Sequence, residues 1–219
     1  MATLWGFESL PRHQFNPLPW IVLCVALLAG CAAPQPLGPQ ERSKIGAVRI
    51  DAEVKRVPEM FYLPPGHAVG LMFGGVGGAI TGASLAEPRQ AMQAFVERNG
   101  IRIERIVSEE LDAALRRSGK LPVVDGPADG AATIRAFVRQ YGFGVPNALS
   151  SKVVPIVFIE CSIVDSAGKT LWTSSDRVLT LGNPVEPVSV EELRDNPKLI
   201  ESTWRQATKH IIASILGAM

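Results

Sequence analysis

The side chains best suited to nucleophilic, acid–base or metal chemistry are few and widely spaced in this sequence. The three cysteines and three histidines are Cys24, Cys31, Cys161, His13, His67 and His210. This scatter excludes a disulfide-rich scaffold, and no cysteines or histidines have the close spacing of a metal site. His67 follows a Pro-Gly turn and His210 lies in a predicted helix, so we expect both at the surface rather than acting as catalytic bases.

Paired carboxylates make no better case for catalysis. Glutamate pairs occur at 109–110 and 191–192, but adjacent helical residues point about 100° apart, so the members of a pair do not share a site. Cys161 lies between isoleucines in an alternating apolar stretch, which predicts a buried, unreactive thiol. The sequence therefore predicts a protein without enzymatic activity, metal or cofactor.

One predicted strand, residues 131–143, carries a mixed polar face opposite its apolar one. Arg135, Phe137, Arg139 and Tyr141 alternate with small and branched apolar residues. Two guanidinium groups beside aromatic rings could bind an anionic or glycan ligand. The alternative is a face that is simply solvated or covered by a helix.

An apolar run at residues 18–30 precedes the second cysteine. It is shorter than the roughly 20 residues that span a membrane and suits the core of a secretory signal. The run ends in Leu28, Ala29 and Gly30, immediately before Cys31. These four residues resemble a bacterial lipobox, in which small residues fit a narrow cleavage site and a thiol forms the thioether to lipid.

The lipobox resemblance implies both a cellular location and a lipid anchor. It implies removal of the signal peptide, residues 1–30, and attachment of diacylglycerol and a further acyl chain such as palmitate to Cys31. Because Ala32 and not Asp follows, it also implies sorting to the outer membrane. Residues 31–44 are rich in proline and polar residues, which predicts a flexible tether. We expect a single periplasmic domain over 45–219.

A glycine-rich, uncharged stretch at residues 68–86 interrupts this domain. Gly70, Gly74, Gly78 and Gly82 recur every four residues, which on a helix would line one side and admit another helix closely. The pattern resembles a glycine zipper and implies oligomerisation or membrane contact. Two alternatives remain. The stretch could be a flexible loop, because each glycine costs a helix about 1 kcal/mol relative to alanine. It could also be a helix packed on its own domain.

Apolar periodicity predicts the remaining elements. Strands are expected at 45–54, 57–63, 121–124, 131–143, 153–164 and 170–181, and helices at 89–99, 103–118 and 199–215. Segregated helices and a hairpin-rich sheet predict an α+β two-layer sandwich, with a mostly antiparallel sheet and helices on one face. The turn at 164–172 and the element order resemble small periplasmic lipoproteins of curli secretion and penicillin-binding-protein activation, which implies a fold but no function.

The charge composition argues against nucleic acid as a partner. The 22 lysines and arginines nearly balance 21 aspartates and glutamates, so no excess charge draws the protein to nucleic acid. We expect a membrane-anchored, non-enzymatic binding or assembly component of the cell envelope, held by its N-terminal lipid. It would act as a homo-oligomer or with an envelope protein. The alternatives are an auxiliary lipoprotein of a lipid, solute or secretion apparatus, and an unrecognised envelope hydrolase.

Overall fold

The computed structural model describes residues 36–66, 82–126 and 130–219. Its elements are α2 (Pro39–Arg42), β1 (Val48–Ile50), β2 (Lys55–Arg56), β3 (Phe61–Tyr62), α4 (Gly82–Arg98), α5 (Ile103–Ser118), β4 (Ala132–Gly144), β5 (Lys152–Val164), β6 (Thr170–Val178), β7 (Val188–Ser189), α6 (Val190–Asp195) and α7 (Lys198–Gly217). Within these ranges, no helix is both long and apolar enough to cross a membrane.

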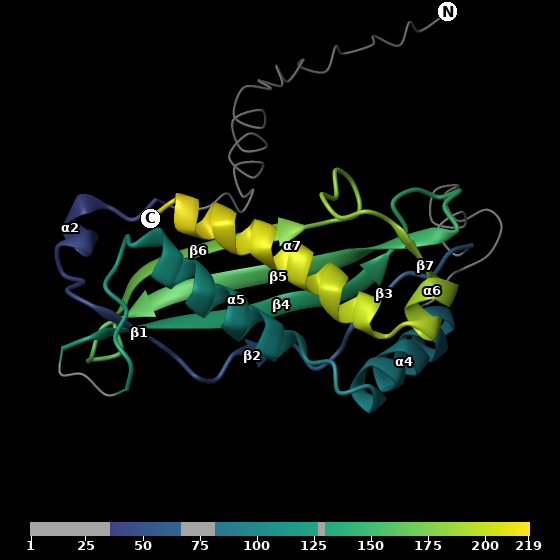
Figure 1. Cartoon of the computed structure of the whole chain (residues 1–219), viewed down its shortest axis with the longest axis horizontal. Coiled ribbons are helices and arrows are strands. Elements are labelled where there is room, and N and C mark those ends of the chain that lie inside the picture. The colour runs from purple at the N-terminus through teal and green to yellow at the C-terminus, as the bar shows by residue number, and fades with distance from the viewer. Residues whose placement is uncertain (1–35, 67–81, 127–129) are drawn as a thin grey trace, which may run out of the picture. The chain divides into compact units, whose positions relative to one another are not determined.

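The sheet is built around three long antiparallel strands. β4, β5 and β6 follow one another as a meander, with Val138 opposite Ile159 and Cys161 opposite Ser174. The short strands β1, β2 and β3 pair in parallel with successive parts of β4, and β7 pairs with the start of β5 (Figure 1). The predicted α+β class with a mostly antiparallel sheet is confirmed.

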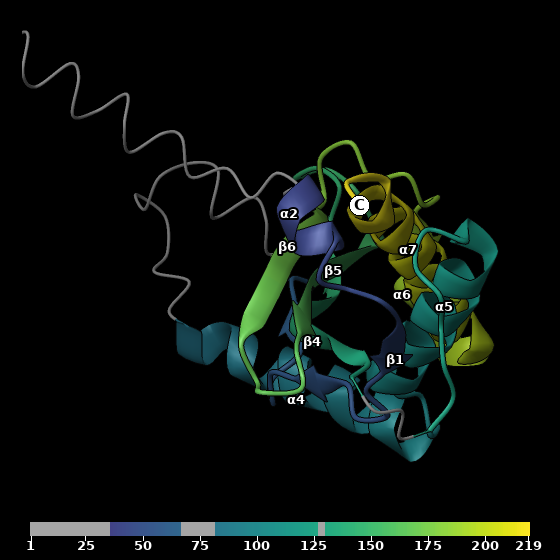
Figure 2. The same ribbon diagram turned by 90° about the vertical axis from the view of Figure 1, so that its left-hand side faces the viewer.

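Helices α5 and α7 run side by side across one face of this sheet (Figures 1 and 2). The strand residues that face them are fully buried, as are the apolar residues that the helices present in return. These core residues include Ile134, Val138, Ile159, Ile163, Ile106, Leu115, Trp204, Ile211 and Ile215. The i, i+3, i+4 spacing seen in the sequence thus produces the helix–sheet interface.

Other predicted boundaries differ from the structure. The strand expected at 45–54 is reduced to β1, and the one expected at 57–63 becomes the two-residue strand β3, because this chain pairs with β4 only in short stretches. The strand expected at 121–124 is a single parallel bridge between Val123 and Val48. Helix α4 begins at Gly82, so Pro88 lies inside it; proline's fixed φ suits a helix, which continues at the cost of one hydrogen bond.

The segment before β1 also differs from the expected tether. Leu37 is buried, and its N–H donates to the carbonyl of Ala218 at 3.0 Å. α2 follows, and Ile45 is buried as well. Leu37 and Ile45 therefore pack on the domain, Leu37 beside the end of α7, while the α2 residues between them are not buried; residues 31–35 of the expected tether lie outside the described residues.

Candidate functional site

Most of the site residues predicted from the sequence lie outside the described residues. These are the lipidation site Cys31, the lipobox residues Leu28, Ala29 and Gly30, and the zipper glycines Gly70, Gly74 and Gly78. Gly82, the last glycine of the repeat, is the first residue of α4. Lipidation and zipper packing therefore remain predictions.

Cys161 is a buried core residue, as predicted. Its side chain is fully buried on the helix-facing side of β5, and it forms no disulfide. Burial, with a smaller contribution from the adjacent Glu160, raises the pKa of the thiol to about 12. A thiol that stays protonated and inaccessible is a poor nucleophile. His210 is exposed on α7, also as predicted.

The arginines of the outer sheet face are neutralised by carboxylates. Arg139 binds both carboxylate oxygens of Glu160, the shorter contact being 2.9 Å, and its guanidinium lies 4.5 Å from the centre of the Phe137 ring. Arg135 pairs with Asp51 at 3.2 Å. The hollow of about 540 Å³ that these residues line is therefore charge-balanced, and its aromatic ring is covered, which disfavours the anionic or stacked glycan ligand considered above.

Tyr141 does not share that face, contrary to the sequence prediction. A β-bulge between Val138 and Gln140 inserts one residue into β4 and reverses the alternation beyond it. Tyr141 consequently points to the helix side, where its ring meets Trp204 edge-on at 5.7 Å and its hydroxyl accepts a hydrogen bond from Arg56. A small hollow of about 450 Å³ adjoins this cluster.

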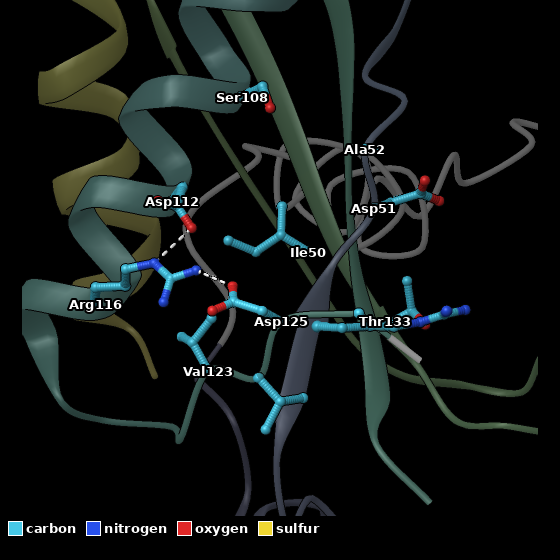
Figure 3. Close-up of a pocket in the computed structure, with 12 residues that line it drawn as sticks. Ile50, Asp51, Ala52, Ser108, Asp112, Arg116, Val123, Asp125 and Thr133 are labelled. Carbon is cyan, nitrogen blue, oxygen red and sulfur yellow. Dashed lines mark hydrogen bonds and ion pairs between the residues drawn. The ribbon is translucent and has the colours of Figure 1, made fainter. Parts of the chain in front are cut away.

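A further candidate site is a cleft of about 520 Å³ between α5 and the β1 edge of the sheet, called here the α5–β1 cleft (Figure 3). Helix α5 contributes Ser108, Asp112 and Arg116 at helical spacing, so all three face the same side. The strand side and the 123–126 segment contribute the rest, namely Arg49, Ile50, Asp51, Ala52, Val123, Val124, Asp125, Gly126 and Thr133.

Charge in the α5–β1 cleft is organised around one guanidinium. Arg116 donates to Asp112 at 2.8 Å and to Asp125 at 2.5 Å, so the arginine bridges two carboxylates (Figure 3). These hydrogen bonds raise the pKa of Arg116 above its ordinary value. On the opposite wall, Arg49 donates to the Thr133 hydroxyl at 2.9 Å.

This arrangement suits binding by hydrogen bonds over an apolar floor. Two arginines and three aspartates line the cleft, giving a formal charge of −1, while Ile50 and Val123 form its apolar part. Carboxylates accept from hydroxyl or amide donors, and the guanidinium and Ser108 can donate. A neutral, hydrogen-bonding ligand or a polypeptide segment fits these groups better than an anion does.

Local sequence pattern does not predict this cleft. Its only local signal is the four-residue spacing of Asp112 and Arg116, which is common on solvated helices. Asp125 joins them through the chain that pairs with β1 at Val123, a contact between segments far apart in the sequence. No periodicity reveals such a contact.

Comparison with known proteins identifies no family. No family model and no curated protein matches the chain. A solved Xanthomonas campestris protein of the DUF330 family aligns with 13% identity and a TM-score of 0.36 over 52% of this chain, which spans only 57% of that protein. A PelC variant from Paraburkholderia phytofirmans, a dodecamer, aligns with 10% identity and a TM-score of 0.34 over 86% of this chain and 92% of its own. At these TM-scores neither likeness carries an argument.

Proposed function

We propose that this chain is a lipid-anchored protein of the bacterial outer membrane that acts at the periplasmic face by binding or assembly, without catalysing a reaction. The observation that carries the proposal is the run Leu28-Ala29-Gly30-Cys31 after an apolar signal-like segment. Several acyl chains on one cysteine make a durable anchor, because each buried methylene contributes about 0.8 kcal/mol.

The packing of Leu37 supports a domain held close to its anchor. Cys31 precedes Leu37 by six residues, which span at most about 20 Å when extended. The anchor thus lies within that reach of the end of the domain where Leu37 bonds to Ala218. A domain joined to its anchor by so short a linker is suited to partners in or at the membrane rather than to partners far from it.

The α5–β1 cleft is the surface that we assign to partner or ligand recognition. It offers donors and acceptors on rigid elements, a helix and a sheet edge, around an apolar floor. Its charges already have partners, since Arg116 pairs with Asp112 and Asp125, Asp51 pairs with Arg135 and Arg49 donates to Thr133. Such paired groups recognise shape and hydrogen bonds more readily than net charge.

Replacing Cys31 with Ser tests the anchor. The thioether cannot form without the thiol, so we expect no incorporation of labelled palmitate and an uncleaved precursor in the inner-membrane fraction. The wild-type protein should be labelled and should sediment with outer membranes. Normal labelling and maturation of Cys31→Ser would refute lipid anchoring at this residue.

Site-specific photo-cross-linking in intact cells tests the cleft. A photoreactive residue in place of Ser108, which lines the cleft, should capture a discrete envelope partner. The same residue in place of Lys169, in the exposed β5–β6 turn, is the matched control. Equal capture at both positions would refute recognition by the cleft, and capture of a transport or secretion component at Ser108 alone would support the auxiliary role in such an apparatus.

A further inference from the structure

A second hollow, of about 480 Å³, lies between the C-terminal halves of α5 and α7, and we call it the basic groove. Its rim carries three cationic side chains, and its floor is small and apolar. The cations are Arg117, Lys120 and Lys209, and the apolar residues are Ala114, Ile212, Ala213 and Leu216.

Among the described residues, none of these three cations has a carboxylate partner. Arg117 donates to the carbonyl of Ala113 at 3.1 Å, and Lys120 donates to the carbonyls of Leu216 and Gly217 at 2.6 and 3.3 Å. Lys209 is exposed on α7. The one carboxylate that lines the groove, Glu110, is engaged by Arg205 at 2.8 Å. The residues that line the groove therefore carry an excess of positive charge.

The helix dipole explains only part of this excess. Cations are stabilised at the last turn of a helix, where carbonyl groups lack partners, and Arg117 and Lys120 fit that description. Lys209, however, lies eight residues before the end of α7 at Gly217, more than two turns away. The effect falls off within the last turn, so another reason is needed for a third cation at this groove.

The basic groove is at the end of the domain that leads to Cys31. Lys120 binds the carbonyls of Leu216 and Gly217, and Leu37 binds that of the next residue, Ala218. Figure 2 shows α2 and the C-terminus together at this end. A lipid anchor within about 20 Å of Leu37 holds the groove near the headgroups of the membrane.

We propose that the basic groove binds the phosphate of an anionic phospholipid headgroup in the leaflet that holds the anchor. Arginine and lysine donors match phosphate oxygens, and the apolar floor accommodates the glycerol and upper acyl carbons. This inference rests on the lipid-anchored function proposed above and specifies how the anchored domain is oriented on its membrane.

The test uses the domain without its lipid, beginning at residue 33. This part of the chain is one compact unit with its own hydrophobic core, so it is expected to fold alone. It is sedimented with vesicles of phosphatidylcholine alone or of equal parts phosphatidylcholine and phosphatidylglycerol. We expect binding only to the anionic vesicles, falling about fivefold for each groove cation removed.

The test variant is Arg117→Gln with Lys209→Gln, which leaves the Lys120 contact to α7 intact. The control is Arg98→Gln with Lys198→Gln, which removes the same charge elsewhere; Arg98 donates to the carbonyl four residues earlier as Arg117 does. Circular dichroism confirms that both variants fold. Equal loss of vesicle binding in both variants would overturn the groove as a site and would indicate a general charge effect.

Titration with inorganic phosphate, monitored by NMR of the backbone amides of the groove, distinguishes a site for free phosphate from a site for lipid headgroups. Saturable shifts without preference for anionic vesicles would overturn the headgroup assignment. Because no arm needs Cys31, failure here leaves the anchoring proposal intact. Conversely, failed palmitate labelling leaves the groove's affinity for anionic vesicles measurable.

Discussion

Replacing Gly142 with Ala should detach β3 from the sheet. Gly142 has a φ of 145°, a region that favours glycine, and it pairs with Phe61 of β3. A Cβ at this position would lie 1.7 Å from the carbonyl oxygen and 2.7 Å from the carbonyl carbon of Phe61. These are backbone atoms, so no side-chain rotation can relieve the clash, and the two strands must separate.

The size of the effect follows from what β3 contributes. Separation exposes Met60 and Tyr62, which are buried, and breaks the hydrogen bond from Leu63 N–H to the Phe143 carbonyl at 3.0 Å. Burial of one large apolar side chain contributes about 1.5–3 kcal/mol and one hydrogen bond about 1 kcal/mol. Because two such side chains are exposed, we expect the free energy of unfolding to fall by about 5–8 kcal/mol for complete separation of β3, including about 1 kcal/mol of backbone strain from alanine at positive φ.

Two control substitutions at other glycines separate the cost of backbone strain from the cost of the steric clash with Phe61. Gly168 has a φ of 82° in the β5–β6 turn with open space around it, so Gly168→Ala should cost about 1 kcal/mol from backbone strain alone. A Cβ on Gly144, which has no positive φ, would meet only side-chain atoms of its neighbours, so Gly144→Ala should cost less than Gly142→Ala. Urea unfolding followed by circular dichroism gives the three free energies, and hydrogen exchange of the Leu63 amide reports β3 directly. A Gly142→Ala protein no less stable than Gly168→Ala, with Leu63 still protected, would refute the argument.

Three further predictions concern ionisation, the free thiol and the glycine repeat. Burial raises the pKa of Tyr62 and Tyr141, the two tyrosines of the chain. The stability that their neutral side chains contribute is therefore present below pH 10 and is lost as the pH rises through their raised pKa values in the folded protein. Phenolate absorbance in the folded protein below pH 10 would contradict this. Cys161→Ala should cost only about 1 kcal/mol, and the native thiol should not react with a disulfide reagent at pH 8 until the protein unfolds. Gly74→Leu with Gly78→Leu should reduce self-association in native mass spectrometry while circular dichroism stays unchanged, if the glycines form a close helix contact; unchanged assembly would favour the loop interpretation.

The parts of the fold that the sequence predicted correctly are those with strong local periodicity. Helix α5 begins at Ile103 and ends at Ser118, where Gly119 adopts a φ of 60°, as its apolar stripe and terminal glycine indicated. The long strands and α7 were predictable for the same reason. Two- and three-residue strands such as β1 and β3 carry too little pattern, because pairing with β4 decides where they form.

The alternation of residues in β4 gave a wrong prediction beyond the point where one inserted residue shifts the pairing of β4 with β5. The bulge after Val138 is set by the pairing of β4 with β5, which alternation within β4 alone does not reveal. As a result, the strand face that was predicted to hold Arg135, Arg139 and Tyr141 together holds the two arginines but not the tyrosine. The α5–β1 cleft was missed for a related reason, since Asp125 reaches Arg116 only after the chain has folded back along β1.

Cations along the α5–α7 pair differ in whether a carboxylate neutralises them, and this bears on the proposed contact with anionic lipid. Towards the first halves of both helices, Arg105 and Arg205 form ion pairs with Glu109, Glu110 and Glu201, so these two cations are neutralised by carboxylates. At the other end, the basic groove carries cations without carboxylate partners among the described residues. On the proposal that the basic groove binds headgroups, an anionic leaflet is attracted by the unpaired cations of the groove, whereas the arginines of the network are already neutralised by glutamates and add little to that attraction.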